Sequence, residues 1–312
     1  MKEVLITGGA GFVGSNLAKM IRNEHGAKVT ILDDFFTGSE KNLTGLDVEV
    51  VKGSVLNADL LMAHTRNKDV IFHLAARNII ASSQNPYEDL TNNIIGTYNV
   101  LQACKQNQVK RMVYTSTSSV YGNAKHIPVN EDDGINLLNF YSVSKYAGEG
   151  YAKTFYEQYN LPVSIVRYSN VFGINQAPSN PYCGVIGKFI QKALTGEPLL
   201  IHGDGEQTRD YTFVEDACRA TILAALDQKA IGEVFNIGTG VETSVNNLAK
   251  AVLEITGGKS EHIQYIDKRD IDNIRRRVLN IEKIRYKLKF FPQITLKDGL
   301  ARTIKWQKET GA

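Results

Sequence analysis

The chain is poor in cysteine and has no long apolar run. Its 312 residues include three cysteines, Cys104, Cys183 and Cys218, an odd number without CxxC spacing. This count indicates neither a disulfide framework nor a zinc cluster, and we expect no metal ion. No apolar run approaches the roughly 18 residues that a membrane span requires. These absences exclude disulfide-rich and membrane-spanning proteins and favour a reducing compartment, so we expect a cytoplasmic protein.

An excess of one charge is also missing. The chain carries 36 Lys and Arg against 33 Asp and Glu, a net charge of +3, which gives no electrostatic signature of a nucleic-acid binder. With 26 Gly, 7 Pro and 43% hydrophobic residues, the composition is that of a folded globular protein. The length allows two domains or one large α/β unit. We expect an enzyme or binding protein for a small molecule, without nucleic-acid or membrane partners.

Short apolar segments alternate with longer helical patterns in the first half of the chain. The apolar segments span residues 4–6, 29–32, 48–51, 70–74, 112–115 and 163–166. Buried β-rich runs separated by helix-length segments are typical of parallel sheets. The pattern therefore predicts an α/β fold with a doubly wound parallel sheet. Residues 86–106 carry apolar side chains at helical spacing and predict a long crossover helix.

The pattern changes after residue 168. Residues 175–182 contain two prolines and several Asn and Ser, which predicts a loop, and helices are predicted at 185–195 and 244–256. No linker separates the two parts, so we expect interleaved domains. A dinucleotide-binding domain would contain residues 1–168 plus about 210–240, and a smaller substrate domain residues 169–209 plus 241–312.

A glycine-rich turn joins the first predicted strand to a helix, with the sequence Thr-Gly-Gly-Ala-Gly-Phe-Val-Gly. Gly8 suits the tight turn, Gly11 lets a pyrophosphate approach the backbone, and Gly14 allows close helix packing. Asp33, at the end of the next strand, can accept hydrogen bonds from both adenosine ribose hydroxyls and would repel a 2′-phosphate. The context of strand, helix and acid predicts NAD as the cofactor, rather than a glycine turn that binds nothing.

Tyr141 and Lys145 are one helical turn apart in a predicted helix. Beside NAD, this spacing suits a phenol whose pKa is lowered by the ammonium group and by the positive nicotinamide, which makes it a usable base near neutral pH. Upstream, the predicted strand 112–115 ends in the hydroxyl-rich run Ser-Thr-Ser-Ser-Val-Tyr-Gly. Each motif alone could be structural, but ligands of doubly wound sheets bind at the carboxyl ends of strands. Together the motifs predict a catalytic site.

These motifs follow one another along nearly the whole chain. They are TGGAGFVG, Asp33, FHLAA at 72–76, Asn93 with GT at 96–97, STSSVYG, YSVSK, RYSNVFG at 167–173 and GDGEQTRD at 203–210. On these residues the chain resembles the extended short-chain dehydrogenase/reductase family. It is most similar to the NAD-dependent nucleotide-sugar epimerase/dehydratase branch, near UDP-glucose 4-epimerase-like enzymes. The resemblance implies a Rossmann fold and a bound NAD.

The resemblance also implies roles for individual residues. Thr117 is expected to bind the 4-hydroxyl of the sugar, Tyr141 to act as the acid/base, and Lys145 to support it and bind ribose; these three are the expected catalytic residues. The expected cofactor-binding residues are Gly8, Gly11, Phe12, Val13, Asp33, Ser54, Val55, Leu74, Ala75, Ala76, Asn93, Tyr141, Lys145 and Tyr168. The expected substrate-binding residues are Thr117, Ser118, Ser119, Tyr141, Asn170, Val185, Arg209, Arg269 and Asp272. Of these, Asn170, Arg209 and Arg269 are expected at the diphosphate and Asp272 at the nucleotide ribose.

Some residues depart from the family pattern or are interpreted as structural. Ser54 stands where the family usually has an Asp facing adenine, so that contact is weaker or replaced. The basic run 275–277 has no family counterpart and is interpreted as a solvated face. Asp34 is interpreted as a solvated loop acid, His73 as a residue of a buried strand, and Cys183 as a packing residue near the sugar.

The residues after Thr117 help to choose among the reactions of this branch. The 4,6-dehydratases place Asp and Glu at these two positions, and glucuronate decarboxylases usually carry Glu at the second; here they are Ser118 and Ser119. A serine hydroxyl cannot act as a general acid near neutral pH. Keto-sugar reductases usually prefer NADPH, against which Asp33 argues. We therefore expect a 4-epimerase that moves hydride from sugar C4 to NAD and returns it to the opposite face.

Several alternatives stay open. The sugar is most simply that of UDP-glucose or UDP-galactose, but the three hydroxyls from Thr117 to Ser119 could bind a carboxylate, as in a UDP-glucuronate 4-epimerase or decarboxylase. A dehydratase or reductase is a further alternative. A non-catalytic NAD-binding scaffold belongs to a different class, because fold does not fix function. The family resemblance also implies a homodimer packed through helices at 86–106 and 141–159.

Overall fold

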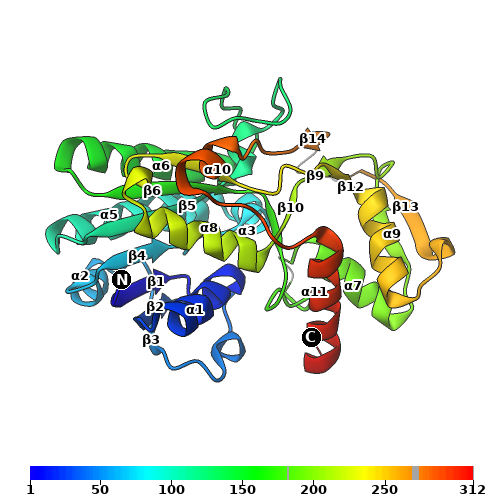
Figure 1. Ribbon diagram of the computed structural model, residues 1–312, viewed down its shortest axis with the longest axis horizontal. Helices are drawn as coiled ribbons and strands as arrows, with labels where there is room; N and C mark the ends of the chain where they lie inside the picture. The colour runs from blue at the N-terminus through cyan, green and yellow to red at the C-terminus, as the bar shows by residue number, and fades with distance from the viewer. Residues whose placement is uncertain (181–182, 269–273, 312) are drawn as a thin grey trace.

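The computed structural model describes residues 1–180, 183–268 and 274–311. Its centre is a parallel seven-stranded sheet in the order β3-β2-β1-β4-β5-β6-β11 (Figure 1). The strands are β1 (Glu3–Thr7), β2 (Lys28–Asp33), β3 (Glu49–Lys52), β4 (Val70–His73), β5 (Arg111–Thr117), β6 (Val163–Tyr168) and β11 (Val234–Ile237). The strand order reverses direction beside β1, as in doubly wound folds.

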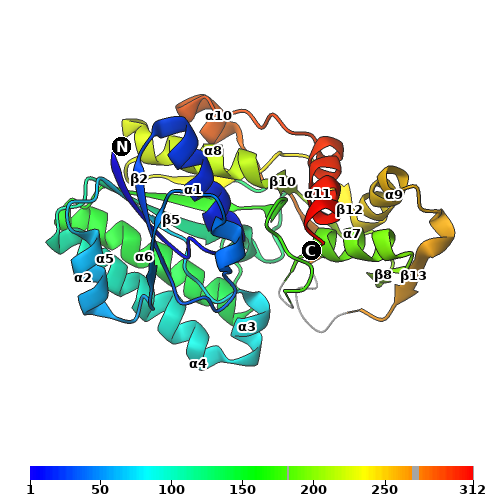
Figure 2. The same ribbon diagram turned by 90° about the horizontal axis from the view of Figure 1, so that it is seen from below.

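Helices cover both faces of the sheet. The helices α1 (Phe12–His25) and α8 (Val214–Leu226) lie on one face, and α2 (Ala58–Thr65), α5 (Gly96–Gln106) and α6 (Phe140–Tyr159) on the other (Figure 2). Alternation along each strand explains the two layers: in β1, Val4 and Ile6 enter the core under α1, whereas Leu5 enters the core under α5. The predicted α/β class with a doubly wound parallel sheet is confirmed.

The predicted crossover helix at 86–106 is helical throughout but has a local change of winding. It consists of α4 (Pro86–Asp89), the π-helical turn η2 (Leu90–Ile95) and α5, and the short helix α3 (Ile79–Gln84) precedes it. A π-helical turn has one extra residue and is frequently found at functional sites. Here it carries Asn92 and Asn93, both buried.

One predicted strand is less buried than its sequence indicated. The apolar segment at 48–51 was expected to be a core strand, but β3 is the edge strand of the sheet, and Val50 is 44% exposed. An edge strand has one neighbour only, so its apolar side chains are covered on fewer sides.

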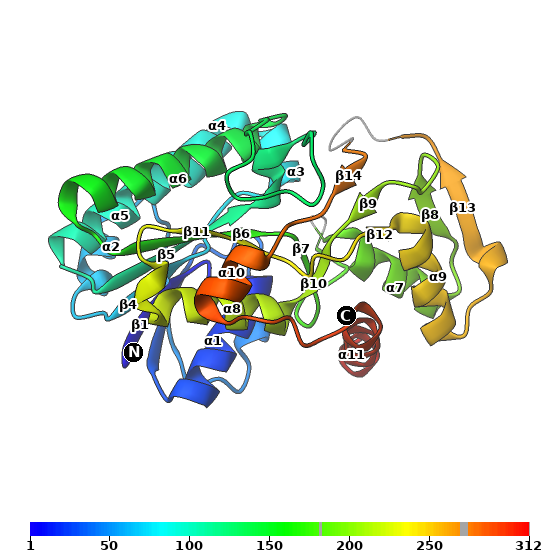
Figure 3. The ribbon, with the colours of Figure 1, turned by 45° about the horizontal axis from the view of Figure 1, so that its top comes forward.

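Most elements after β6 form a second region beside the sheet; the exceptions are α8, β11 of the central sheet, and the helical elements η4 (Gln228–Ala230) and α10 (Glu282–Leu288) packed near them. The predicted helices are present as α7 (Val185–Thr195) and α9 (Val245–Thr256), and they pack with α11 (Leu296–Thr310). Figure 3 shows several short strands between these helices and the sheet. The strands of this region are β7 (Asn170–Phe172), β8 (Leu199–His202), β9 (Thr208–Arg209), β10 (Tyr211–Phe213), β12 (Thr243–Ser244), β13 (Ile263–Ile266) and β14 (Arg276–Arg277).

The remaining helical elements are short. They are η1 (Glu40–Leu43), η3 (Ser118–Tyr121), η4 (Gln228–Ala230), η5 (Ser260–His262) and α10 (Glu282–Leu288). None of the helices in the described ranges is long and apolar enough to cross a membrane.

Candidate active site

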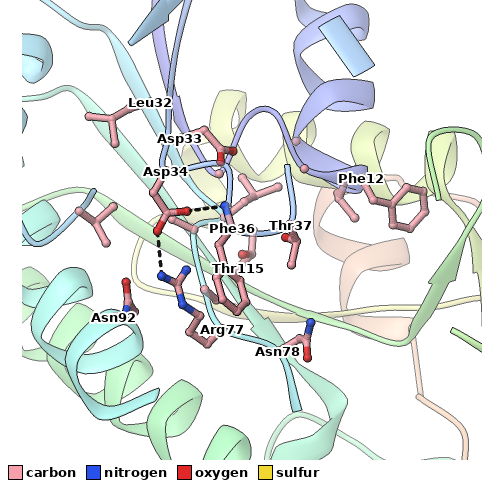
Figure 4. Close-up of a pocket in the computed structure, with 18 of the residues that line it drawn as sticks. Phe12, Leu32, Asp33, Asp34, Phe36, Thr37, Arg77, Asn78, Asn92 and Thr115 are labelled. Atoms are coloured by element: carbon pink, nitrogen blue, oxygen red, sulfur yellow. Dashed lines mark hydrogen bonds and ion pairs between the residues drawn. The ribbon is translucent and has the colours of Figure 1, made fainter. Parts of the chain in front are cut away.

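A cavity opens at the carboxyl edge of the sheet, where the loops after β1, β2 and β4 meet (Figure 4). The glycine loop lines one part of it and the pair Tyr141 and Lys145 another. Its lining residues are Gly8, Gly11, Phe12, Val13, Gly14, Leu32, Asp33, Asp34, Phe36, Thr37, Gly53, Val55, Leu74, Ala75, Ala76, Arg77, Asn78, Asn92, Thr115, Ser116, Tyr141, Lys145 and Tyr168. Two motifs about 130 residues apart in the chain therefore share one cavity.

The glycine loop is shaped by close backbone contacts. Gly8 has a φ of +72°, and its amide donates to the carbonyl of Leu32 over 2.8 Å. A Cβ on Gly14 would lie 2.2 Å from the carbonyl oxygen of Gly8, so only glycine lets α1 pack this closely. Helix α1 begins after Gly11 without a side-chain cap. Its first amides are thus available for an anion, and the loop fits the pyrophosphate of a dinucleotide.

Asp33 ends β2 next to this loop and is held rigidly. Its Oδ2 accepts from the amide of Ala10 over 2.9 Å and its Oδ1 from the amide of Phe35 over 2.8 Å. Burial raises the pKa of the carboxyl, although these two hydrogen bonds oppose that effect. The position fits the expected contact with an adenosine ribose.

Asp34 is exposed, as the sequence interpretation expects, but it is more than a solvated loop acid. It also lines the cavity, its side chain is 30% exposed, and its Oδ2 accepts from Nη2 of Arg77 over 2.8 Å. The ion pair forms because the loops after β2 and β4 approach each other at the sheet edge, which nothing local to Asp34 indicates.

Tyr141 and Lys145 lie on the first turns of α6. Asn139 caps this helix, since its side chain accepts from the amide of Ser142 over 2.9 Å while the Ser142 hydroxyl contacts the Asn139 amide. Both catalytic candidates face the cavity, and Lys145 is 2% exposed. Its ammonium lies 4.3 Å from the ring centroid of Tyr114.

The ionisation of this pair differs from the sequence expectation. Burial raises the pKa of Tyr141 to about 12, although hydrogen bonding to Thr117 lowers it in part. Burial also lowers the pKa of Lys145 to about 7, against the opposing charges of Glu149 and Asp89. The protein's own groups thus raise, rather than lower, the pKa of Tyr141, because desolvation of the phenolate outweighs the hydrogen bond with Thr117.

A buried ion pair connects α6 to the central sheet. Glu149, one turn beyond Lys145, is bound by Arg167 through Nε at 2.9 Å and Nη2 at 2.7 Å. The Ser116 hydroxyl, which lines the cavity, donates to Oε1 of the same carboxylate over 2.5 Å. The pair thereby joins the ends of β5 and β6 to α6. Sequence reasoning missed Glu149, although its spacing of four from Lys145 was a usable signal.

Two expected cofactor residues lie beside the cavity and do not line it. The Ser54 hydroxyl accepts from the Leu56 amide over 3.2 Å. Asn93 is turned inward, and its amide bonds to the backbone of Arg77 and to Asp89. Its neighbour Asn92 lines the cavity instead.

His73 is fully buried in β4 between two threonine hydroxyls. Nδ1 lies 2.7 Å from the Thr7 hydroxyl and Nε2 2.9 Å from the Thr97 hydroxyl. Because Thr97 donates its proton to the Asn93 carbonyl, it accepts from Nε2. Burial lowers the pKa of His73 to about 3, so the neutral ring serves as a structural link between strands and helix.

Four of the candidate substrate residues lie at or just after the carboxyl ends of β5 and β6. Thr117 is the last residue of β5, and Ser118 and Ser119 follow it in η3, all at most 9% exposed. Thr117 pairs in register with Tyr168, and Asn170 begins β7 two residues later. Thr117 hydrogen-bonds to Tyr141, whereas Thr117, Ser118, Ser119 and Asn170 are not among the residues that line the cavity.

Arg209 and Val185 come from the second region. Arg209, on β9, is 7% exposed, and its Nη1 donates to the carbonyls of Thr208 and Ile274, each over 2.8 Å. Val185 is the first residue of α7. Arg269 and Asp272 lie outside the described residues.

The basic run 275–277 is only partly a solvated face. Arg275 binds Asp204 and Arg276 binds Glu242 at the surface. Arg277, however, is 5% exposed and pairs in register with Arg209 across β14 and β9. Strand pairing turns alternate side chains to opposite faces, so one residue of the run had to point inward. Cys183 is buried, with Sγ 3.8 Å from the carbonyl of Gln176.

Comparisons with known proteins agree with this geometry. The model of the NAD dependent epimerase/dehydratase family matches residues 4–238. The chain belongs to this family. Among curated relatives, it is 38% identical to a putative UDP-glucose 4-epimerase of Methanocaldococcus jannaschii, covering 98% of each chain. It is 37% identical to a UDP-N-acetyl-alpha-D-glucosaminuronate decarboxylase of Bacillus cytotoxicus, covering 99% of this chain and 98% of the relative.

A solved structure superposes on nearly the whole of this chain. The UDP-glucose 4-epimerase of Thermotoga maritima, crystallised with UDP-glucose, superposes with a TM-score of 0.94 at 34% identity, covering 99% of this chain and 100% of the other. Membership makes the protein an NAD-dependent enzyme of the epimerase/dehydratase type, with NAD as its cofactor. Relatives of similar sequence identity are named for different reactions, so family membership alone does not identify the substrate.

Proposed function

We propose that the protein is an NAD-dependent nucleotide-sugar 4-epimerase, acting on UDP-glucose and UDP-galactose or a close UDP-sugar. The observation that carries the proposal is that one cavity holds the glycine loop, Asp33, Tyr141 and Lys145, and that Thr117, at the end of β5, hydrogen-bonds to Tyr141. Bound in this cavity, NAD would accept a hydride from sugar C4. The same hydride would later return to C4 from the opposite face of the ring.

The residues of this chain move the proton. Thr117 binds the 4-hydroxyl and Tyr141 removes its proton as C4 becomes a carbonyl carbon, then returns the proton after the sugar has turned. With the pKa of Tyr141 at about 12, the phenol needs added positive charge to act as a base near neutral pH. Lys145, in its protonated form, provides part of that charge, and a bound oxidised nicotinamide adds to it.

The substrate half of the site holds the nucleotide while the sugar turns. Asn170 and Arg209 are proposed to bind the diphosphate, together with Arg269, and Asp272 to bind the ribose. Val185, at the start of α7, is proposed to contact the nucleotide sugar. Anchoring at the diphosphate positions the reacting carbon at both stages, because binding energy away from the reacting centre lowers the cost of orientation.

The acids of the cavity argue against dehydration and decarboxylation. Among the described lining residues, the carboxylates are Asp33, the last residue of β2, and Asp34, which directly follows it. Glu149 is bound by Arg167 and lies beneath the site. A UDP-glucuronate 4-epimerase is the second candidate, because the buried hydroxyls of Thr117, Ser118 and Ser119 could bind a carboxylate.

The test is an incubation of purified protein, without added reductant, with UDP-glucose, UDP-N-acetylglucosamine and UDP-glucuronate separately, followed by proton NMR. We expect the C4 epimer of one of them. A 4-keto-6-deoxy product or release of carbon dioxide would refute the proposed reaction. Unchanged substrate in every sample would favour a substrate with another nucleotide, a keto-sugar reductase or the non-catalytic NAD-binding scaffold.

We also propose a homodimer formed through α5 and α6. These helices expose large apolar side chains, including Tyr98 at 38%, Val143 at 45%, Tyr146 at 37% and Tyr151 at 43%. Covering such a face is favourable, since buried apolar area stabilises association. X-ray scattering that gives a monomer mass at micromolar concentration would refute it. The cytoplasmic location and the interleaved domain boundaries also stay predictions.

A further inference from the structure

An ion pair and a ring contact join two loops that border the cofactor cavity. Nη2 of Arg77 lies 2.8 Å from Oδ2 of Asp34, and the Arg77 guanidinium carbon lies 4.0 Å from the ring centroid of Phe36 (Figure 4). All three residues line the cavity. We name this group of Asp34, Phe36 and Arg77 the clasp.

The strand order determines where the clasp lies. Asp34 and Phe36 follow β2, and Arg77 follows β4, while β1 lies between these two strands in the sheet. A contact between the loops after β2 and β4 therefore crosses the end of β1. The glycine loop, where the pyrophosphate is expected to bind, begins at that end.

Both sides of the clasp are fixed by further contacts. The backbone amide of Arg77 donates to Oδ1 of Asn93 over 2.7 Å, and its carbonyl accepts from the Asn93 amide over 3.0 Å. On the other side, Oδ1 of Asp34 accepts from the Phe36 amide over 3.0 Å. The Arg77 side chain is only 13% exposed, so its charge interactions are weakly screened by solvent.

We infer that the clasp retains NAD in its cavity by closing the loops after β2 and β4 over the cofactor. Arg77 is the central residue, because it contacts both Asp34 and Phe36. Release of NAD then requires this guanidinium to leave Asp34 and Phe36; its Nε also lies 3.5 Å from Oε2 of Glu88, on the same side of the clasp as Arg77. A reaction that oxidises and re-reduces the same substrate needs no exchange of cofactor, so slow release is compatible with turnover.

The test measures cofactor exchange, not catalysis. The variants Arg77→Ala, Arg77→Lys and Asp34→Asn are purified, and the half-time for replacement of bound NAD by radiolabelled NAD is measured. The matched control is Arg275→Ala, which removes a similar ion pair, to Asp204 at 2.7 Å, on the exposed surface of the second region. Circular dichroism and melting temperature verify that each variant is folded.

We expect roughly tenfold faster exchange for Arg77→Ala, from the loss of a partly buried ion pair and a cation–π contact. Asp34→Asn loses the ion pair alone and should exchange about threefold faster. Arg77→Lys should exchange faster than the unmodified protein but more slowly than Arg77→Ala, because lysine keeps the charge but stacks less well on a ring. Arg275→Ala should match the unmodified protein.

Two results would overturn the inference. Unchanged or slower exchange in folded Arg77→Ala would mean that the contacts do not hold the cofactor or that they obstruct it. Faster exchange in Arg77→Ala with no change in Asp34→Asn would mean that Arg77 acts without the clasp. Because exchange needs no sugar substrate, the outcome is independent of whether the proposed epimerisation is observed.

Discussion

The cofactor side and the substrate side of this site are built differently. On the cofactor side, each loop directly follows a strand of the central sheet, so Gly8, Asp33 and Ala75 are positioned by neighbouring parallel strands. On the substrate side, Arg209 lies on a strand of two residues that pairs with β12 and β14, which are distant in sequence. The comparison suggests that cofactor binding tolerates little change in the loop backbone, whereas substrate binding depends on side chains brought together over long range.

The largest expected effect lies where the two sides meet. Tyr141→Phe should lower kcat by about 10²–10⁴-fold, the usual contribution of a positioned acid/base, while NAD content stays unchanged. Tyr146→Phe, on the same helix and 37% exposed, is the matched control and should remain active. Loss of bound NAD in Tyr141→Phe would show that this residue belongs to the cofactor side alone.

A change confined to the substrate side should separate substrate from cofactor binding. Arg209→Met removes a buried guanidinium that is proposed to bind diphosphate, and should raise KM by roughly 10- to 100-fold through lost charged hydrogen bonds. Arg276→Met, on the neighbouring strand and exposed, should leave KM unchanged. Calorimetric NAD binding that weakened equally in Arg209→Met would contradict the separation.

A change confined to the cofactor side should act through the backbone. Gly14→Ala places a Cβ 2.2 Å from the Gly8 carbonyl oxygen, and we expect a loss of about 1–3 kcal/mol in stability together with weaker NAD binding. Gly150→Ala is the control, since a Cβ there meets nothing within 4 Å and alanine favours a helix. Urea unfolding and NAD titration would measure both; a Gly14→Ala protein with normal NAD affinity would refute the close-packing role.

The smallest effect is a pH dependence at Lys145. Burial lowers the pKa of Lys145 from 10.5 to about 7, so between these pH values the unfolded chain binds more protons than the folded one. This residue therefore makes the free energy of unfolding rise with pH above about 7, by at most about 1.4 kcal/mol per pH unit. From pH 7 through 8 to 9, the urea midpoint should rise less in Lys145→Met than in the unmodified protein. An identical rise with pH in the two proteins would contradict the lowered pKa.

Local patterns allowed much of the cofactor side to be predicted. The spacing of Gly8, Gly11 and Gly14 and the interval between Tyr141 and Lys145 depend on one turn and one helix each, whose geometry is set by nearby residues. The predicted helices at 185–195 and 244–256 were found for the same reason, since Gly and Ser mark their ends.

Other features depended on contacts that no local pattern contains. The Asp34–Arg77 pair joins residues 43 positions apart, and Arg277 is buried because β14 pairs with β9. The orientation of Asn92 toward the cavity follows from a π-helical turn that apolar spacing alone does not reveal.

The sequence by itself determined the sheet class and the cofactor, and it identified Tyr141 and Lys145 as the candidate catalytic pair, because these follow from strand length, glycine spacing and helical periodicity. The tertiary structure decided which acids face the cavity, which arginines are buried and which loops close on each other. These depend on strand order and on desolvation, both of which arise only when distant segments pack together.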